Sequence, residues 1–306
     1  MRMNKKIAII DMGTNTFHLL IAEPGTQGYE IIHRDRIAVK IGMGGINEGR
    51  ITEEGATRAL LAIQNFKETL QNFSVTKVLA FGTSALRNAK NGLEVINKIK
   101  DETGIETRLI SGDEEATYIY KGVRSAMNLG LQKSLIVDIG GGSVEFIIGN
   151  EKEIYWKQSF EIGAQRLLEE FQKHDPILPE EIERVDTFFS ESLASLFKAM
   201  KEHQPQTLIG SSGTFDTLSD MYCIENNIQL RDIPETPLTI SAFYEIFKKL
   251  KRKNRAERLQ LPGMIEMRVD MIVVACCLIH FLLQNHTFTN IRVSTYSLKE
   301  GVLASL

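Results

Sequence analysis

Residues 135–148 read LIVDIGGGSVEFII, and this stretch decides the fold. Two apolar runs flank an aspartate, three glycines and a serine, which predicts two strands joined by a glycine turn. Glycines lack a Cβ, so backbone N–H groups in such a turn can converge on an anion, while Asp138 and Glu145 can meet a hard cation. The pattern therefore indicates a phosphate and Mg²⁺ site, although an ordinary hairpin turn would contain similar glycines.

The same order of residues occurs near the start of the chain. Residues 7–21 read IAIIDMGTNTFHLLI, so Asp11 corresponds to Asp138, and the two aspartates lie 138 − 11 = 127 residues apart. Repeated supersecondary units indicate repeated substructures. We therefore predict an α/β fold with two lobes whose phosphate-type turns face each other across a cleft.

Size and charge limit the classes of function. The 306 residues suffice for two domains, and the net charge of −3 gives no general attraction to nucleic acid or to a membrane. A polyanionic substrate must therefore meet local basic groups. No apolar run approaches the ~20 residues of a membrane span, and three cysteines form no metal-binding spacing. We expect a cytoplasmic protein; the apolar helices leave a homodimer open.

The intervening sequence alternates between helix and strand patterns. It predicts strands over residues 29–33, 77–82 and 106–110, helices over 53–70, 84–100, 179–203 and 269–283, and a surface loop over 231–237. Residues 34–36 and 37–41 lead from the first of these strands into a glycine loop. A further strand, 206–209, runs into Ser212, Gly213 and Thr214, where a helix N-terminus can bind an anion or simply carry a serine cap.

The most basic run lies between residues 248 and 258 and contains seven Lys and Arg residues. A solvated helix face is the default interpretation of such a run. The alternative is a surface that guides a long polyanion.

Several blocks, in order, resemble the exopolyphosphatase and guanosine pentaphosphate phosphohydrolase (Ppx/GppA) family, within the actin, Hsp70 and sugar-kinase fold. The two glycine turns resemble the family's phosphate loops, and residues 111–116, SGDEEA, resemble the block that carries its catalytic glutamate. The resemblance extends over nearly the whole chain through residues 82–91, 212–214, 261–263 with Arg268 and Asp270, and 299–303.

The resemblance implies two ribonuclease-H-like lobes with an active cleft between them. We expect the first lobe to comprise residues 1–124 with the terminal helix 298–306, and the second to comprise residues 125–297. Longer family members carry a further C-terminal domain, and this chain resembles the short form.

The resemblance also gives each group a role in phosphoanhydride hydrolysis. Glu115 is expected to act as the base, and its neighbour Glu114 is the residue most easily confused with it. Asp138 and Glu145 are expected to hold Mg²⁺, or Mn²⁺, with Asp11 contributing through water. Arg87 is expected to stabilise charge on the phosphate, and a structural arginine of the helix is the alternative that its local sequence leaves open. The expected phosphate-binding residues are Gly13, Thr14, Asn15, Thr16, Thr83, Gly140, Gly141, Gly142, Ser143, Ser212, Gly213 and Thr214.

The leading expectation for function is an exopolyphosphatase that removes terminal orthophosphate from inorganic polyphosphate. Hydrolysis of guanosine pentaphosphate is the nearest alternative, favoured by a pocket for a guanine base instead of a continuous basic track. A kinase of the same fold and a non-catalytic phosphate or alarmone sensor are more distant alternatives.

Overall fold

The first lobe is built around β1, which pairs antiparallel with β2 and parallel with β4. The computed structural model describes residues 6–26, 28–230 and 233–306. The sheet of this lobe has the strand order β3-β2-β1-β4-β5. Its elements are β1 (Ile7–Met12), β2 (Thr16–Gly25), β3 (Gly28–Ala38), η1 (Ile46–Glu48), α1 (Glu53–Asn72), β4 (Lys77–Gly82), α2 (Ser84–Asn88), α3 (Gly92–Thr103) and β5 (Thr107–Leu109).

The second lobe repeats this plan around β6, with the strand order β10-β11-β9-β6-β7-β8. Here β6 pairs antiparallel with β7 and parallel with β9. Its strands are β6 (Ser134–Ile139), β7 (Val144–Gly149), β8 (Ile154–Phe160), β9 (Thr207–Ser211), β10 (Glu235–Thr236) and β11 (Asn290–Ser294). Its helices are α5 (Ala164–Phe171), α6 (Pro179–Ser192), α7 (Ala194–His203), α8 (Gly213–Glu225), α9 (Ile240–Leu250), α10 (Arg255–Leu259), α11 (Glu266–Val269) and α12 (Ile272–Asn285).

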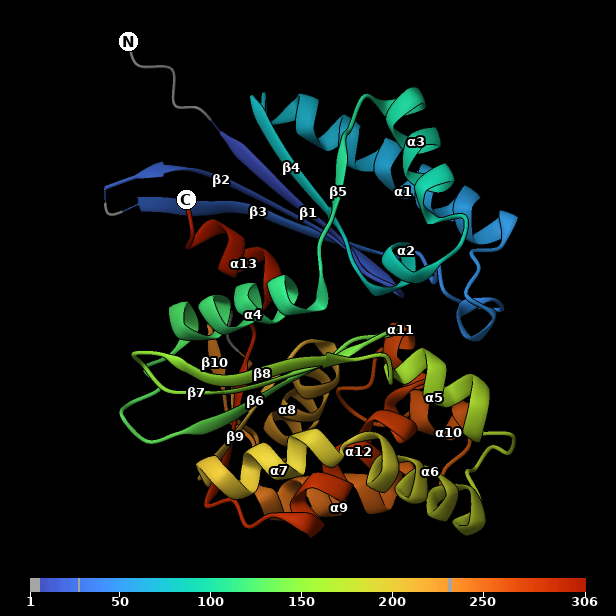
Figure 1. Cartoon of the computed structure of the whole chain (residues 1–306), viewed down its shortest axis with the longest axis vertical. Helices are drawn as coiled ribbons and strands as arrows, with labels where there is room; N and C mark the ends of the chain where they lie inside the picture. Colours follow the sequence, from blue (N-terminus) through green and yellow to red (C-terminus); the bar gives the residue numbers. More distant parts are fainter. Residues whose placement is uncertain (1–5, 27, 231–232) are drawn as a thin grey trace.

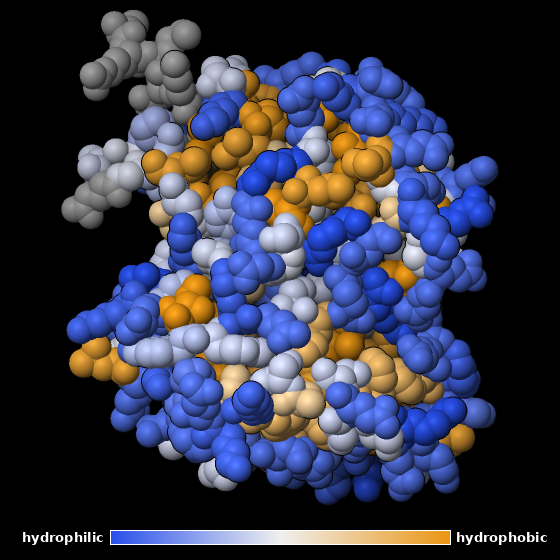
Figure 2. All heavy atoms as spheres, viewed as in Figure 1, coloured by the Kyte–Doolittle hydropathy of each residue, from blue (hydrophilic) through white to orange (hydrophobic). Residues whose placement is uncertain are grey.

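The two lobes therefore share one topology: a hairpin, a third antiparallel strand, and a later strand that joins in parallel (Figure 1). This confirms the predicted two-lobe α/β architecture. Figure 2 shows that the outline narrows between the lobes and that most side chains on this face are hydrophilic.

Side-chain alternation along the central strands separates three cores. On β1, Ile7 and Ile9 face the junction of the lobes, whereas Ala8 and Ile10 face α1 and α3. This alternation follows from the two-residue period of a strand. The junction core also receives Ile136 from β6, so one apolar layer is shared between the two sheets.

Two helices fill this junction, α4 (Gly112–Ala126) and α13 (Leu298–Leu303). The terminal helix α13 packs against α4 and β1, on the side of the first lobe (Figure 1). The two helices approach most closely at Gly301, where a Cβ would lie 1.7 Å from the Tyr118 carbonyl oxygen. The division of the chain at residues 124 and 125 stays a prediction.

Three of the predicted helices are interrupted. Residues 84–100 form α2 and α3, because Ala89 is extended. Residues 179–203 form α6 and α7, separated by the fully buried Leu193. The predicted helix over 269–283 divides into α11 and α12, and Asp270 between them binds Arg255 and Lys40. A hydrophobic period identifies the buried face but not such local breaks.

The longest apolar helix does not offer a dimer surface. Most residues of α12, including Cys276 and Cys277, are buried in the core of the second lobe. A homodimer therefore stays a prediction. In the described part of the chain, no helix combines the length and the apolar character that a membrane crossing requires. Of the predicted surface loop, Arg231 and Asp232 lie outside the described residues.

Candidate active site between the lobes

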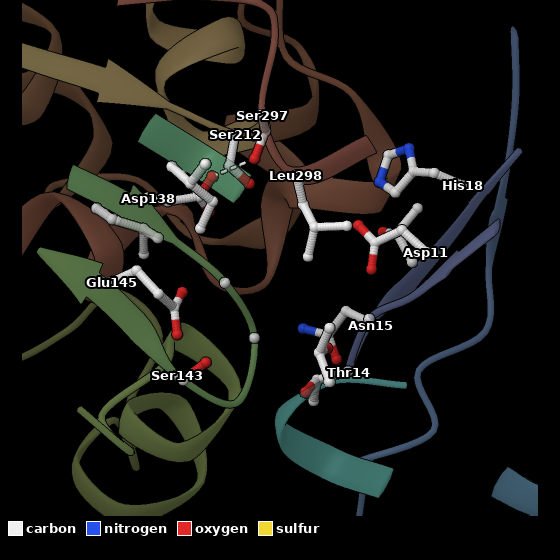
Figure 3. Close-up of a pocket in the computed structure, with 18 of the residues that line it drawn as sticks. Asp11, Thr14, Asn15, His18, Asp138, Ser143, Glu145, Ser212, Ser297 and Leu298 are labelled. Carbon is white, nitrogen blue, oxygen red and sulfur yellow. Dashed lines mark hydrogen bonds between the residues drawn. The ribbon is translucent and has the colours of Figure 1, made fainter. Parts of the chain in front are cut away.

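The two glycine turns face each other across the lobe junction, as the sequence repeat predicted. Each turn is closed by the same bond: Gly13 N donates to Thr16 O at 3.2 Å, and Gly140 N donates to Ser143 O at 3.0 Å. A Cβ on Gly141 would lie 2.6 Å from Asn15 Nδ2. Glycine is therefore required for the second turn to approach the first this closely. Figure 3 shows Thr14 and Asn15 opposite Ser143 and Glu145.

Equivalent strand positions carry polar residues in both lobes. In the first lobe Asp11 pairs with His18, and His18 pairs with Arg36 on β3. In the second lobe Asp138 pairs with Glu145, and Glu145 pairs with Ser159 on β8. His18 is therefore the positional counterpart of Glu145. Burial, with Lys299 and Arg268 nearby, holds the pKa of His18 well below its usual range, so this imidazole is neutral.

A cavity of about 100 Å³ lies between the turns. Nearly all of the predicted site residues line it: Asp11, Gly13, Thr14, Asn15, Thr16, Thr83, Glu115, Asp138, Gly140, Gly141, Gly142, Ser143, Glu145, Ser212 and Gly213. Two do not. Thr214 lines a smaller neighbouring cavity, and Arg87 is held outside by other partners. The structure thus brings together residues from both lobes that lie up to 202 positions apart in the chain (213 − 11).

Glu115 reaches this cavity from the first turn of α4. Ser111 caps the helix by accepting a hydrogen bond from Glu114 N at 3.1 Å, which fixes where the helix begins. Glu114 then points away from the cavity and pairs with Arg108 at 2.6 Å. Burial raises the pKa of Glu115 to about 8, Arg87 acts in the opposite direction, and the charges of Asp11 and Asp138 add to the rise.

Three further carboxyl groups surround the same cavity. Burial raises the pKa of Asp11 to about 7, and it raises the pKa values of Asp138 and Glu145 as well. Ser297 donates a hydrogen bond to Asp138 Oδ2, and Ser159 donates to Glu145 Oε1 at 2.6 Å (Figure 3 draws the first). Asp11 Oδ1 is buried without a hydrogen-bond partner in the described part of the chain.

This donor set fits a hydrated divalent cation. Buried acids with raised pKa values gain stability when a positive charge enters their cavity, and Asp11 Oδ1 has an unused acceptor. Within residues 6–26, 28–230 and 233–306, no three His, Cys, Asp or Glu side chains converge as direct metal ligands. Mg²⁺ suits such an arrangement, because it keeps several of its waters when it binds carboxylates.

Three cations outside the predicted set of site residues also line the cavity: Arg36 from β3, Arg268 from α11 and Lys299 from α13. Arg268 Nε is buried with no hydrogen-bond partner among the described residues. Burial lowers the pKa of Arg268 below its ordinary value. A buried N–H group without a hydrogen-bond partner is costly, so an anion that accepts a hydrogen bond from Arg268 Nε relieves that cost.

The sequence offered a signal for two of these cations. Arg268 and Lys299 lie in blocks that resemble the family, although neither was among the expected site residues. Arg36 lay between two predicted segments, whereas the structure shows one continuous β3. Only the strand register places Arg36 beside His18 at the cavity.

Arg87 takes a different position from the one expected. Its Nη1 donates to Glu115 Oε2 at 2.9 Å and to Ile110 O at 3.0 Å, while its Nη2 donates to Glu161 Oε1 at 3.1 Å. The guanidinium is therefore engaged by protein acceptors. Its direct contact with phosphate stays a prediction, and Glu161 is a neighbour that sequence reasoning missed.

The basic run of residues 248–258 does not form one continuous surface. Arg258 is only 1% exposed and pairs with Asp175 at 2.6 Å. Arg255 pairs with Asp270 at 2.7 Å, and Lys249 pairs with Glu225 at 2.7 Å. Several of these charges therefore hold the second lobe together, and the interpretation of the run as a track for a polyanion is weakened.

Comparison with known proteins agrees with this geometry. The model of the Ppx/GppA phosphatase family matches residues 20–306. A crystal structure of an exopolyphosphatase from Cytophaga hutchinsonii is 44% identical, with a TM-score of 0.96 over 98% of this chain and 97% of that one. The Ppx/GppA family member from Aquifex aeolicus is 26% identical, with a TM-score of 0.79 over 98% and 97%.

A curated relative gives the same result. Exopolyphosphatase 1 of Mycobacterium tuberculosis is 23% identical over 300 residues, which is 97% of this chain and 87% of the relative. With the family model spanning most of the sequence and both glycine turns assembled at one cavity, the chain belongs to the Ppx/GppA phosphatase family.

Proposed function

We propose that this chain is an exopolyphosphatase, a hydrolase that releases terminal orthophosphate from inorganic polyphosphate. The observation that carries the proposal is the position of Glu115, a buried carboxyl group in the cavity between two anion-binding turns. Relatives named as exopolyphosphatases support the choice of substrate.

The reaction assigns a role to each group. Backbone amides of the two glycine turns bind the oxygens of the terminal phosphoryl group, as anion-binding turns do. The oxygen of a water forms a bond to the terminal phosphorus while the bond between this phosphorus and the bridging oxygen breaks. The bridging oxygen leaves with the shortened chain, and the water oxygen becomes part of the released orthophosphate. Glu115 orients the water and accepts its proton, so the reaction requires Glu115 to be ionised.

The cations of the cavity offset the charge that the reaction brings. Arg36, Arg268 and Lys299 provide donors from three separate elements. Donors arranged in advance stabilise developing charge because they need not reorganise during the reaction. When bound beside Asp11, Asp138 and Glu145, Mg²⁺, or Mn²⁺, would neutralise phosphate charge.

A second cavity, of about 260 Å³, gives the rest of the substrate a place to lie. It shares Arg36 and Lys299 with the first cavity and adds Arg34. Basic groups therefore continue beyond the site of cleavage, as a polymer of phosphates needs, although Asp35, Asp216 and Glu300 line this cavity as well. Tyr296 also lines this second cavity. Its aromatic ring favours the alternative substrate, guanosine pentaphosphate, because a ring can stack on a guanine base.

Cysteine chemistry supports a cytoplasmic site of action. Cys223, Cys276 and Cys277 are buried free thiols. Unpaired cysteines are typical of reducing compartments.

The test is phosphate release by the purified protein with Mg²⁺, comparing long-chain polyphosphate with guanosine pentaphosphate. Release from polyphosphate that is lost in Glu115→Gln supports the proposal. Release from the nucleotide alone establishes the alternative. Binding of either compound without release refutes hydrolysis and identifies a sensor, and transfer of phosphate from ATP to an acceptor identifies a kinase.

A further inference from the structure

One carboxylate outside the cavity joins the two lobes beside Glu115. Glu161 follows β8 in the second lobe, and its Oε2 accepts hydrogen bonds from Ser84 Oγ at 2.5 Å and Arg166 Nη2 at 3.2 Å. Its Oε1 accepts from Arg87 Nη2 at 3.1 Å. Because Ser84 and Arg87 belong to α2 of the first lobe, these bonds require the lobes to be closed.

Arg87 links this carboxylate to Glu115. One nitrogen, Nη2, is held by Glu161, and the other, Nη1, donates to Glu115 Oε2 at 2.9 Å. A guanidinium is planar, so one of its nitrogens cannot change direction without moving the other. The bond to Glu161 therefore acts together with the bond from Nη1 to Ile110 O to set the direction from which Arg87 reaches Glu115.

We propose that Glu161 is a positioning residue that holds Arg87 against Glu115 when the two lobes are closed. The role of Glu115 as base rests on the proposed function, whereas the contact itself is independent of it. If the lobes move apart, Glu161 withdraws from α2, and Arg87 keeps only the bonds of its Nη1 atom, to Glu115 and to Ile110 O.

The charges around Glu115 explain why this orientation matters. Glu115 faces Arg87 from α2, Asp11 from β1, Asp138 from β6 and Glu145 from β7. The three acids oppose its ionisation, as burial does, and Arg87 is the group that favours it. When Arg87 turns away, Glu115 holds its proton to higher pH and fewer molecules carry an active base.

A neighbouring contact supplies a matched control. Glu169 on α5 also joins the lobes, because its Oε1 accepts a hydrogen bond from Gly44 N at 3.0 Å. In the described part of the chain, the donors to this carboxylate are Gly44 N and Gln165 Nε2, and Glu169 does not line the catalytic cavity. Glu169→Gln therefore weakens an interlobe contact without affecting the orientation of Arg87.

The experiment compares Glu161→Gln and Glu169→Gln with the wild type in two ways. The pH dependence of kcat/KM is measured by phosphate release, and the titration of the Glu115 carboxyl is measured by ¹³C NMR, assigned with Glu115→Gln. In Glu161→Gln we expect kcat at pH 7 to fall roughly tenfold to hundredfold, with KM little changed. Both the acidic limb and the Glu115 titration should move to higher pH. Glu169→Gln should leave both where they are.

Wild-type behaviour of Glu161→Gln in both measurements would overturn the proposal. Equal shifts in the two variants would also overturn it, because they would reflect lobe closure in general. A wild-type protein that releases no phosphate would refute the proposed function instead. The carboxyl titration requires no turnover, so it would still decide whether Glu161 positions Arg87.

Discussion

Replacing Glu115 with Gln should strongly lower activity and stabilise the protein at the same time. The pKa of Glu115 is raised from 4.5 to about 8, first of all by burial. The folded protein therefore holds this proton more tightly than the unfolded chain does. The resulting stability is complete below about pH 4.5 and is lost as the pH rises through about 8. Gln resembles the protonated side chain and does not ionise in the unfolded chain.

The size of the effect follows from the same values. Between pH 4.5 and pH 7, Glu115 ionises in the unfolded chain but stays largely protonated in the folded protein. This difference lowers the free energy of unfolding of the wild type by at most about 3 kcal/mol, at 1.36 kcal/mol per pH unit. The free energy of unfolding of Glu115→Gln should therefore exceed that of the wild type by up to this amount at pH 7, and by less than about 1 kcal/mol at pH 5. Loss of a general base should lower turnover by roughly a hundredfold to ten-thousandfold.

The assay is urea unfolding at pH 5 and pH 7 in the presence of a chelator, because a bound cation would favour the ionised carboxylate. Glu114→Gln is the matched control, since Glu114 pairs with Arg108 on the surface. It should retain activity and change stability by about 0.5 kcal/mol at most. A Glu115→Gln protein that is less stable at pH 7, or equally stabilised at both pH values, would refute the electrostatic reasoning. Near-normal turnover would refute the assignment of the base.

Three further predictions concern binding and packing. Arg36→Met should raise KM roughly tenfold, because a charge-assisted contact is worth about 1.5 kcal/mol or more. An unchanged KM would show that Arg36 does not contact the substrate. Arg258→Met should destabilise the protein by about 3 kcal/mol in chemical unfolding, because it removes a buried guanidinium and leaves the partly exposed Asp175 without its partner; the exposed Arg252→Gln is its control, and equal stability of the two variants would contradict the structural role. Gly301→Ala should cost about 1–3 kcal/mol, because α13 must move away from Tyr118; an unaltered melting temperature would show that the helices can separate freely.

Local features of the sequence were sufficient to predict the two halves of the fold. Each glycine turn and its flanking strands lie within about fifteen consecutive residues, so the aspartate, the glycines and the apolar runs are visible together. The pairing of Asp138 with Glu145 is fixed by the length of the turn. The repetition of this unit then predicted two facing lobes, which the structure confirms.

The cations of the site depended on tertiary structure, because strand register and helix packing place them. Arg36 reaches the cavity through the pairing of β3 with β2, and Lys299 through the return of α13 to the first lobe. Arg258 shows the converse: it belongs to the most basic run of the sequence, yet it is buried against Asp175, 83 residues away.

By itself, the sequence determined the two phosphate-type turns, the α/β character of the lobes and the carboxyl groups that surround the cavity. Only the tertiary structure decided which charges meet there. Glu161 of the second lobe contacts Arg87 of the first lobe across 74 residues of the chain. Periodicity shows which face of an element is buried, but a charged side chain finds its partner through the packing of distant elements.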